Sequence, residues 1–124
     1  MLVVDDSRSS RRALIRSLGD FDFDFDEASD GLEALRRLKE TSYDLIFTDL
    51  EMPQLNGMEL LREIRTGKRT MDVPIVMVTS RGEDEFRQEA RRLGANDYLT
   101  KPVSEAVVTQ AIERLQNQQE RSSE

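Results

Sequence analysis

Two kinds of segment alternate along the chain: short runs of β-branched and aromatic residues, and longer stretches in which apolar residues recur every three or four positions. The short runs predict five strands, at 2–4, 21–25, 45–47, 74–78 and 97–99. The longer stretches predict five helices that begin near residues 7, 30, 56, 83 and 104, the last of them ending near residue 115. This order predicts an α/β fold with a single, doubly wound sheet of five parallel strands, right-handed crossovers and helices on both faces.

Two of the strands differ in their polarity. The run at 45–47, Leu-Ile-Phe, is apolar on both faces, as expected of a central parallel strand. The run at 21–25 alternates Phe with Asp, which predicts one wet face and a place at the edge of the sheet. Charged residues at an edge also discourage pairing with another chain.

Residue choices at the helix ends support these boundaries. Ser7, Asp30 and Asn56 can each accept a hydrogen bond from the first helical turn, and the last two are followed three residues later by Glu. Gly19 and Gly94 are expected to end two of the helices. The polar residues from 116 onward are expected to fray, so we predict one domain over 1–118 and a polar tail over 119–124.

The composition narrows the possible functions. A length of 124 residues suits a single domain, and a formal charge of −7 argues against a nucleic-acid-binding surface. No apolar run approaches the ~20 residues that span a bilayer, and no signal peptide opens the chain, so a cytoplasmic protein without membrane contact is expected. The chain has no Cys and no His, which excludes disulfides, zinc–thiolate sites and Ser-His-Asp triads.

Polar side chains follow four of the predicted strands, at the sheet edge where open α/β sheets bind their ligands. They are Asp5, Asp6, Asp49, Thr79 and Lys101. Three carboxylates close together repel one another, and oxygen ligands without His or Cys favour Mg²⁺ or Mn²⁺. The lysine and the hydroxyl supply donors for a phosphoryl group, and one carboxylate can serve as a nucleophile. The sequence therefore predicts a site for phosphoryl transfer to or from an Asp.

The sequence contains no recognisable nucleotide-binding loop. Its six glycines are scattered, and no Gly-rich loop precedes a Lys-Ser or Lys-Thr pair. Direct ATP binding is therefore not expected, and the phosphoryl group should arrive on another protein or on a small donor.

Four motifs occur in order along the chain: LVVDDS at 2–7, DLIFTDLEMPQLNG at 44–57, PIVMVTS at 74–80 and GANDYLTKP at 94–102. With these motifs the chain resembles the receiver domain of two-component response regulators, which has the flavodoxin-like fold of the chemotaxis regulators. The resemblance extends from residue 2 to about residue 115. It implies a phosphorylation-dependent signalling switch, which catalyses only its own phosphorylation and dephosphorylation, rather than an enzyme with a separate substrate.

The resemblance also implies a role for each residue of the site. Asp49 resembles the phosphoacceptor, and Asp5 and Asp6 resemble the acidic pair that holds Mg²⁺ together with Asp49. Glu51 matches the position whose backbone carbonyl binds the metal. Lys101 matches the lysine that pairs with a phosphoryl oxygen, and its bond to the following proline matches one that is cis in the family.

The resemblance also implies roles for two residues in signal output, and it implies the partners of the domain. Thr79 matches the switch hydroxyl that turns toward the phosphoryl group, and Tyr98 matches the aromatic residue whose rotamer follows it. The phosphoryl donor would be a histidine kinase or a phosphotransfer protein. The face formed by the fourth helix, the strand at 97–99 and the helix from 104 would bind a downstream protein. Glu51 and Arg81 lie where side chains tune dephosphorylation in the family, and we hypothesise that they form a lid that slows attack by water.

Other interpretations remain open. Tyr98 can equally be a half-buried core residue. A metal-dependent phosphohydrolase with an Asp nucleophile would use an acid at position 51, although no cap segment is evident. An interaction module without phosphoryl chemistry could have the same fold. The chain could be a stand-alone regulator or a receiver from a hybrid kinase, including a chemotaxis-type kinase.

One acidic series imitates a calcium loop. Its members fall at positions 1, 3, 5, 9 and 12 of such a loop: Asp22, Asp24, Asp26, Asp30 and Glu33. The sixth position, which requires Gly for a sharp turn, is Glu27. We therefore interpret the series as a charged edge strand and not as a calcium site.

Overall fold

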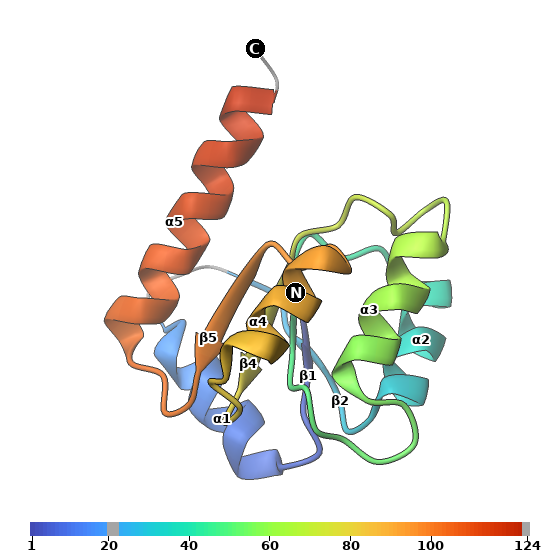
Figure 1. Ribbon diagram of the computed structural model, residues 1–124, viewed down its shortest axis with the longest axis horizontal. Helices are drawn as coiled ribbons and strands as arrows, with labels where there is room; N and C mark the ends of the chain where they lie inside the picture. Colours follow the sequence, from blue (N-terminus) through green and yellow to red (C-terminus); the bar gives the residue numbers. More distant parts are fainter. Residues whose placement is uncertain (20–22, 123–124) are drawn as a thin grey trace.

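The computed structural model describes residues 1–19 and 23–122, and Figure 1 shows one sheet with helices on both sides. The strands are β1 (Leu2–Val4), β2 (Asp26–Ala28), β3 (Ile46–Thr48), β4 (Ile75–Thr79) and β5 (Asp97–Thr100). The helices are α1 (Arg8–Ser17), α2 (Gly31–Glu40), α3 (Gly57–Thr66), α4 (Asp84–Arg92) and α5 (Glu105–Ser122). All strand pairs are parallel, in the order β2-β1-β3-β4-β5. The predicted α/β architecture is confirmed.

Each face of the sheet is covered by its own set of helices. α1 and α5 pack on one face, against a core that includes Phe47 and Val76, and α2, α3 and α4 pack on the other, against Ile46 and Met77. Consecutive strand residues point to opposite faces, so a strand buried on both faces must be apolar throughout. β3 and β4 are buried at every position, which confirms the prediction of a central strand near residue 46.

The second strand is not where the Phe-Asp alternation predicted it. β2 covers Asp26–Ala28, while Phe21 and Asp22 lie outside the described residues. The neighbouring β1 begins only at Leu2, which pairs with Asp26, so earlier residues have no strand beside them to continue the ladder. Phe23 and Phe25 instead pack against the core on the α1 and α5 side. The predicted edge position of this strand is confirmed.

The helix starts follow the sequence signals closely. Ser7 accepts a hydrogen bond from the amide of Ser10, and Asn56 and Glu59 form a complete capping box. Asp30 caps α2 through the amide of Glu33, but the Glu33 carboxylate turns to Ser29. The second capping box is therefore only half formed.

The last helix is longer than predicted. α5 continues from Glu105 to Ser122, and among the side chains described in it, up to residue 118, the last buried one is Leu115. The stretch after it contains Gln, Glu and Arg and neither Gly nor Pro, so helix propensity favours continuation of the helix. Its final turns extend past the sheet in Figure 1. Within the described part of the chain, no helix is long and apolar enough to cross a membrane.

Candidate functional site

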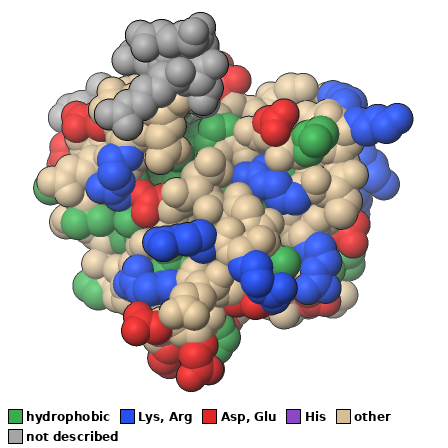
Figure 2. Space-filling view, turned by 45° about the horizontal axis from the view of Figure 1, so that its top comes forward, with side chains coloured by type: hydrophobic (Ala, Val, Ile, Leu, Met, Phe, Trp, Pro, Cys, Tyr) green, Lys and Arg blue, Asp and Glu red, His purple; other side chains and the backbone are tan. Residues whose placement is uncertain are grey.

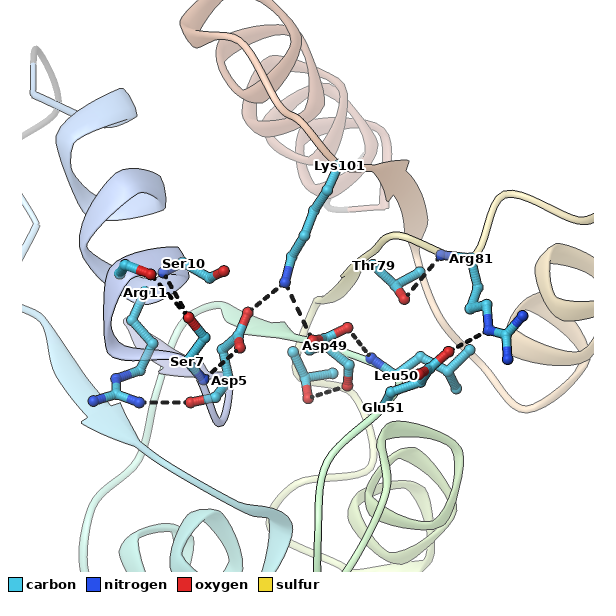
Figure 3. Close-up of polar contacts among 12 residues, drawn as sticks. Asp5, Ser7, Ser10, Arg11, Asp49, Leu50, Glu51, Thr79, Arg81 and Lys101 are labelled. Carbon is cyan, nitrogen blue, oxygen red and sulfur yellow. Dashed lines mark hydrogen bonds and ion pairs between the residues drawn. The ribbon is translucent and has the colours of Figure 1, made fainter.

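Residues distant in the sequence meet beyond the carboxyl ends of β1, β3 and β5. The Lys101 ammonium donates to Asp5 Oδ2 at 2.7 Å and to Asp49 Oδ2 at 3.2 Å. Figure 3 shows the lysine reaching between the two carboxylates from the segment that follows β5. Asp5 comes directly after β1 and Asp49 directly after β3, so the parallel register of these strands places both acids at one edge. The predicted convergence of these residues is therefore present.

Asp49 is held firmly at this edge. Its side chain is buried, and its Oδ1 accepts a hydrogen bond from the amide of Leu50 at 2.7 Å. Its own amide donates to the carbonyl of Val4 at 2.9 Å, which continues the pairing between β3 and β1. The carboxylate is thus fixed by its backbone and by Lys101, in a site where a charge interacts strongly with its neighbours.

The protonation of Lys101 follows from two opposing effects. Burial lowers the pKa of Lys101, but hydrogen bonds and charge from Asp5 and Asp49 outweigh it, so the pKa lies above the usual value for a lysine. The side chain is one quarter exposed, which leaves the ammonium within reach of a ligand that enters the site. Lys101 is therefore a permanent cation at neutral pH.

The three acids are close enough to share one cation. Carboxylate oxygens of Asp5, Asp6 and Asp49 all lie within 4.8 Å of one another. Asp6 is exposed, whereas the other two are buried, so one side of the cluster faces solvent. A group of carboxylates with water access suits Mg²⁺ or Mn²⁺. With Lys101 counted, the site carries an excess of negative charge that a divalent ion would neutralise.

The loop after β3 packs against the backbone of Asp49. Gly57 opens α3, and a Cβ at this position would lie 2.2 Å from the carbonyl oxygen of Asp49. The amide of Gly57 donates to the carbonyl of Leu50 at 2.8 Å and closes the loop. Only glycine allows this approach of backbone to backbone. The loop therefore positions the backbone that contains Glu51 next to the acids.

Arg11 is a site residue that sequence reasoning missed. Its Nη1 donates to the carbonyl of Asp5 at 2.6 Å, and its Nε donates to Glu27 of β2 at 3.0 Å. The Asp5 carboxylate also accepts from the amide of Ser7 at 2.9 Å. The turn from β1 into α1 is thus fixed from two sides. The available signal was Arg11 six residues after Asp5, one turn into the helix that this turn begins.

Thr79 ends β4 on the other side of Asp49. Its side chain is fully buried, and its hydroxyl accepts a hydrogen bond from the amide of Arg81 at 3.2 Å. The Arg81 guanidinium donates to the carboxylate of Glu51, as Figure 3 shows. Both of these side chains are about half exposed, and together with Asp6 they line a pocket at the surface. The pairing of Glu51 with Arg81 is present as predicted, while its effect on dephosphorylation stays a prediction.

Tyr98 lies in β5, the strand that pairs with β4. The side chain is buried, and its hydroxyl donates to the carbonyl of Arg81. Burial raises the pKa of Tyr98, and the nearby charge of Arg87 opposes this effect. Both interpretations of this residue retain support, because Tyr98 contributes to the core and also contacts the segment that follows Thr79.

The peptide bond between Lys101 and Pro102 is cis, as the resemblance implied. An apolar cavity of about 370 Å³ lies behind the acids on the α1 side of the sheet. Its walls include Phe47, Val78 and Leu14, and Asp5, Asp49 and Lys101 line it as well. Apolar walls weaken dielectric screening and so strengthen the attraction between these charges.

The acids of the calcium-like series are used elsewhere. Asp26 accepts from the hydroxyl of Tyr43 at 2.6 Å, Asp30 caps α2, and the Glu33 carboxylate accepts from Ser29. Asp22 lies outside the described residues. Asp26, Asp30 and Glu33 therefore act as structural contacts, which favours the interpretation of this series as part of the fold and not as a calcium loop.

Comparison with known proteins decides the family. Residues 1–113 match the response regulator receiver domain. This chain belongs to the receiver-domain family. It is a receiver domain of two-component signalling systems, a class of protein that acts as a signalling switch and interacts with histidine kinases and downstream targets. The family predicted from the four sequence motifs is confirmed.

The receiver domain covers most of the length of one relative and about half of the length of another. Over 116 residues it is 34% identical to the chemotaxis protein CheY-3 of Vibrio cholerae, and this match covers 93% of the chain and 89% of that protein. Over 115 residues it is 40% identical to the transcriptional regulatory protein ResD of Bacillus subtilis, with 93% of the chain and 47% of that protein covered. The receiver domain therefore spans about half the length of the second relative.

A solved structure bears on the metal. The receiver domain of the sensor histidine kinase PA1611 from Pseudomonas aeruginosa has a TM-score of 0.82 to this chain at 29% identity, with 91% of this chain and 93% of that one covered. That structure holds a magnesium ion coordinated in its active-site cleft. The acidic cluster of the present receiver domain offers oxygen ligands of the kind that such an ion prefers.

Proposed function

We propose that Asp49 accepts a phosphoryl group from a phosphohistidine on a histidine kinase or phosphotransfer protein. A carboxylate oxygen of Asp49 attacks phosphorus, the new P–O bond forms, and the P–N bond breaks. The imidazole leaves with the electron pair of that bond and takes up a proton. The observation that carries this proposal is the buried Asp49 carboxylate, which lies beside two further acids and is hydrogen-bonded to Lys101.

The residues around Asp49 have complementary roles in this proposal. Lys101 already bridges Asp5 and Asp49, and its ammonium can transfer one of these hydrogen bonds to a phosphoryl oxygen. The Thr79 hydroxyl accepts from the amide of Arg81 and keeps its own proton to donate. Turning that proton toward the phosphoryl group would change the packing around Tyr98.

The acidic cluster fits a divalent metal by its chemistry. Asp5, Asp6 and Asp49 would hold Mg²⁺ through carboxylate oxygens, and Glu51 would add its backbone carbonyl. Bound there, the ion would neutralise charge on the phosphoryl oxygens. The side chain of Glu51 pairs with Arg81 instead, which leaves the carbonyl as its contribution.

Signal output is proposed to leave through the face formed by α4, β5 and α5. Tyr98 lies in β5, and α4 packs beside that strand, so a change at Thr79 reaches this face through direct contacts. A protein target would bind there. Contact with nucleic acid is not part of the proposal, because the chain is acidic. The cytoplasm stays the location predicted from the sequence.

Replacing the phosphoacceptor tests the proposal directly. We expect Asp49→Asn to abolish labelling by acetyl phosphate in the presence of Mg²⁺, because an amide cannot act as the nucleophile. Asp44→Asn is the matched control, since Asp44 is exposed and precedes β3 at its opposite end. The control should label like the wild type. Labelled Asp49→Asn protein, with the label mapped to another residue, would refute the assignment.

Beryllofluoride separates the proposal from its rivals. Mg²⁺-dependent binding of beryllofluoride to the wild type and not to Asp49→Asn is expected of a phosphoacceptor. An interaction module without phosphoryl chemistry would bind it in neither protein. A phosphohydrolase would turn over small phosphate esters many times, which we do not expect.

The pair between Glu51 and Arg81 is proposed to shield the phosphorylated Asp49 from water. We expect Arg81→Ala to shorten the lifetime of the aspartyl-phosphate by up to about fivefold, a factor in the range of an exposed ion pair. The lifetime is measured as release of phosphate after removal of the donor. Arg92→Ala breaks a comparable exposed pair with Glu89 and serves as the control. An unchanged lifetime in Arg81→Ala would remove the shielding role.

A further inference from the structure

Arg87 of α4 contacts residues that lie outside the phosphate site. Its guanidinium carbon lies 4.9 Å from the centroid of the Tyr98 ring. Its Nη2 donates to the hydroxyl of Thr100 at 2.6 Å, and its Nη1 donates to the carbonyl of Tyr98 at 3.4 Å. Its Nε donates to the carbonyl of Gly82 at 3.3 Å. One side chain therefore connects α4 with β5 and with the loop that precedes α4.

Tyr98 is thereby held on two sides. Its hydroxyl donates to the carbonyl of Arg81, two residues after Thr79, and the Arg87 cation covers its ring. The side chain is only 9% exposed. A guanidinium stacks well on an aromatic face because its charge is spread over a plane and is weakly hydrated. The contacts that hold Tyr98 in its buried position are thus made with Arg81 and Arg87.

We propose that Arg87 is a positioning residue that holds Tyr98 in its buried position before phosphorylation. Exposure of the Tyr98 ring then requires α4 to release the ring and the Thr100 hydroxyl together. The proposal rests on the proposed function, in which Tyr98 responds to Thr79. It adds that the resting position of Tyr98 is set by a side chain of α4 and not by the phosphate site alone.

The consequence is a specific pattern of exposure. In the wild type, Tyr98 is buried both without and with beryllofluoride, so its exposure changes little. Without Arg87, Tyr98 gains an exposed state that beryllofluoride suppresses, because the movement of Thr79 makes room for the ring. The ratio of exposed to buried Tyr98 should rise by about five- to thirtyfold when the cation–π contact and the hydrogen bonds are lost.

The chain provides its own spectroscopic probe for this test. It has two tyrosines and no tryptophan, so Tyr43→Phe leaves Tyr98 as the one tyrosine that fluoresces. Acrylamide is uncharged, so its quenching of Tyr98 reports exposure without responding to the charge at position 87. Quenching is measured in this background for Arg87→Ala and Arg87→Lys, without and with Mg²⁺ and beryllofluoride. Arg91→Ala is the control, because Arg91 is an exposed cation on the same helix.

We expect stronger quenching in Arg87→Ala than in Arg91→Ala, partial recovery in Arg87→Lys, and loss of the difference when beryllofluoride is added. Equal quenching in Arg87→Ala and Arg91→Ala without beryllofluoride would overturn the proposal. If Arg87→Ala does not fold, Arg87→Gln replaces it, because Gln can still form a hydrogen bond with Thr100 but has no positive charge. Quenching of Arg87→Gln at the level of Arg91→Ala would again overturn the role of Arg87.

Labelling of Asp49 by acetyl phosphate keeps this test separate from the proposed function. Arg87 does not contact the acids, so Arg87→Ala should label like the wild type. If neither the wild type nor any variant is labelled, the phosphoacceptor role of Asp49 is rejected. The role of Arg87 is still decided in that case by the quenching measured without beryllofluoride.

Discussion

Lys101 sets the charge balance of the site at the scale of single residues. Its ammonium contacts Asp5 and Asp49, and their hydrogen bonds and charge outweigh the effect of burial on its pKa. The three acids outnumber this one cation, so the site favours binding of a further cation. The lysine holds Asp5 and Asp49 in place through these contacts.

The raised pKa of Lys101 predicts an alkaline limb of stability. The folded state binds this proton more tightly than the unfolded state, so the contribution is complete below the ordinary lysine pKa of 10.5 and is lost as the pH rises through the higher folded pKa. Above pH 10.5, the free energy of unfolding of the wild type should fall more steeply than that of Lys101→Met, by at most about 1.4 kcal/mol per pH unit.

Urea unfolding at a series of pH values measures this difference. Tyr43 and Tyr98 also have raised pKa values, but both proteins retain them, so their effect cancels. Lys68→Met, which removes an exposed lysine away from the acids, should follow the wild-type curve. Parallel curves for the wild type and Lys101→Met would contradict the prediction.

Individual residues were predictable where the sequence pattern places them at strand ends. Asp5, Asp49 and Lys101 each follow a recognisable strand, and parallel strands deliver their carboxyl ends to one edge. Arg11 and Arg87 were not predictable in this way. Their contacts depend on how α1 and α4 rotate against the sheet, which the spacing of apolar residues does not specify at the level of one side chain.

At the scale of elements, Arg65 joins three segments at the edge of the sheet opposite the site. Its guanidinium donates to the carbonyl of Gly94 at 2.8 and 3.0 Å, to Asn96 at 2.9 Å and to the carbonyl of Thr70 at 3.4 Å. Gly94 has a φ of 106°, and a Cβ there would lie 2.8 Å from the arginine. Burial lowers the pKa of Arg65, yet the group stays charged. The side chain therefore connects α3 to the turn between α4 and β5.

Removing this connection should destabilise the fold. Arg65→Met keeps the apolar stem but leaves the carbonyl of Gly94 and the amide oxygen of Asn96 without this donor. We expect the free energy of unfolding to fall by about 1.5–3 kcal/mol, the range for hydrogen bonds to a charged group. Arg62→Met on the exposed side of α3 is the matched control and should change stability by less than about 0.5 kcal/mol. Equal unfolding midpoints for the two variants would show that the connection contributes little.

The two errors at the scale of elements have different causes. The Phe-Asp alternation has the period of a strand, but a strand needs a neighbour, and β1 is too short to reach that far. α5 continues beyond Leu115 because helix propensity persists after the apolar stripe ends. Periodicity therefore located the buried part of α5, misplaced β2, and failed where pairing or propensity decided the limits of an element.

At the scale of the whole molecule, charge follows the direction of the helices. Basic residues occupy the last turns of four helices: Arg16, Arg37, Lys39, Arg65, Arg91 and Arg92. Acidic residues occupy the first turns of α2, α3, α4 and α5, on the side of the phosphate site. Figure 2 shows Lys and Arg spread over one face and acids gathered at its lower edge. Both arrangements complement the helix dipoles and leave the site end strongly negative.

Metal binding should therefore stabilise the whole fold. At a Mg²⁺ concentration of about 100 times the dissociation constant, the free energy of unfolding should rise by about 2.7 kcal/mol, since the unfolded chain does not assemble the cluster. Asp6→Asn removes one carboxylate of the cluster and should lose most of this gain. Thermal unfolding with Mg²⁺ and with EDTA measures the effect, and Asp44→Asn should behave like the wild type. A gain that is the same in Asp6→Asn would place the ion elsewhere.

The hydrogen bond between Asp5 and Lys101 joins residues separated by 96 positions. During synthesis on a ribosome, Asp5 emerges first, whereas Lys101 emerges only after all five strands have been made. A nascent chain that ends before Lys101 therefore has the acids of the pocket without their ammonium partner. The bridge that closes the pocket therefore forms only after nearly the whole sheet has been made.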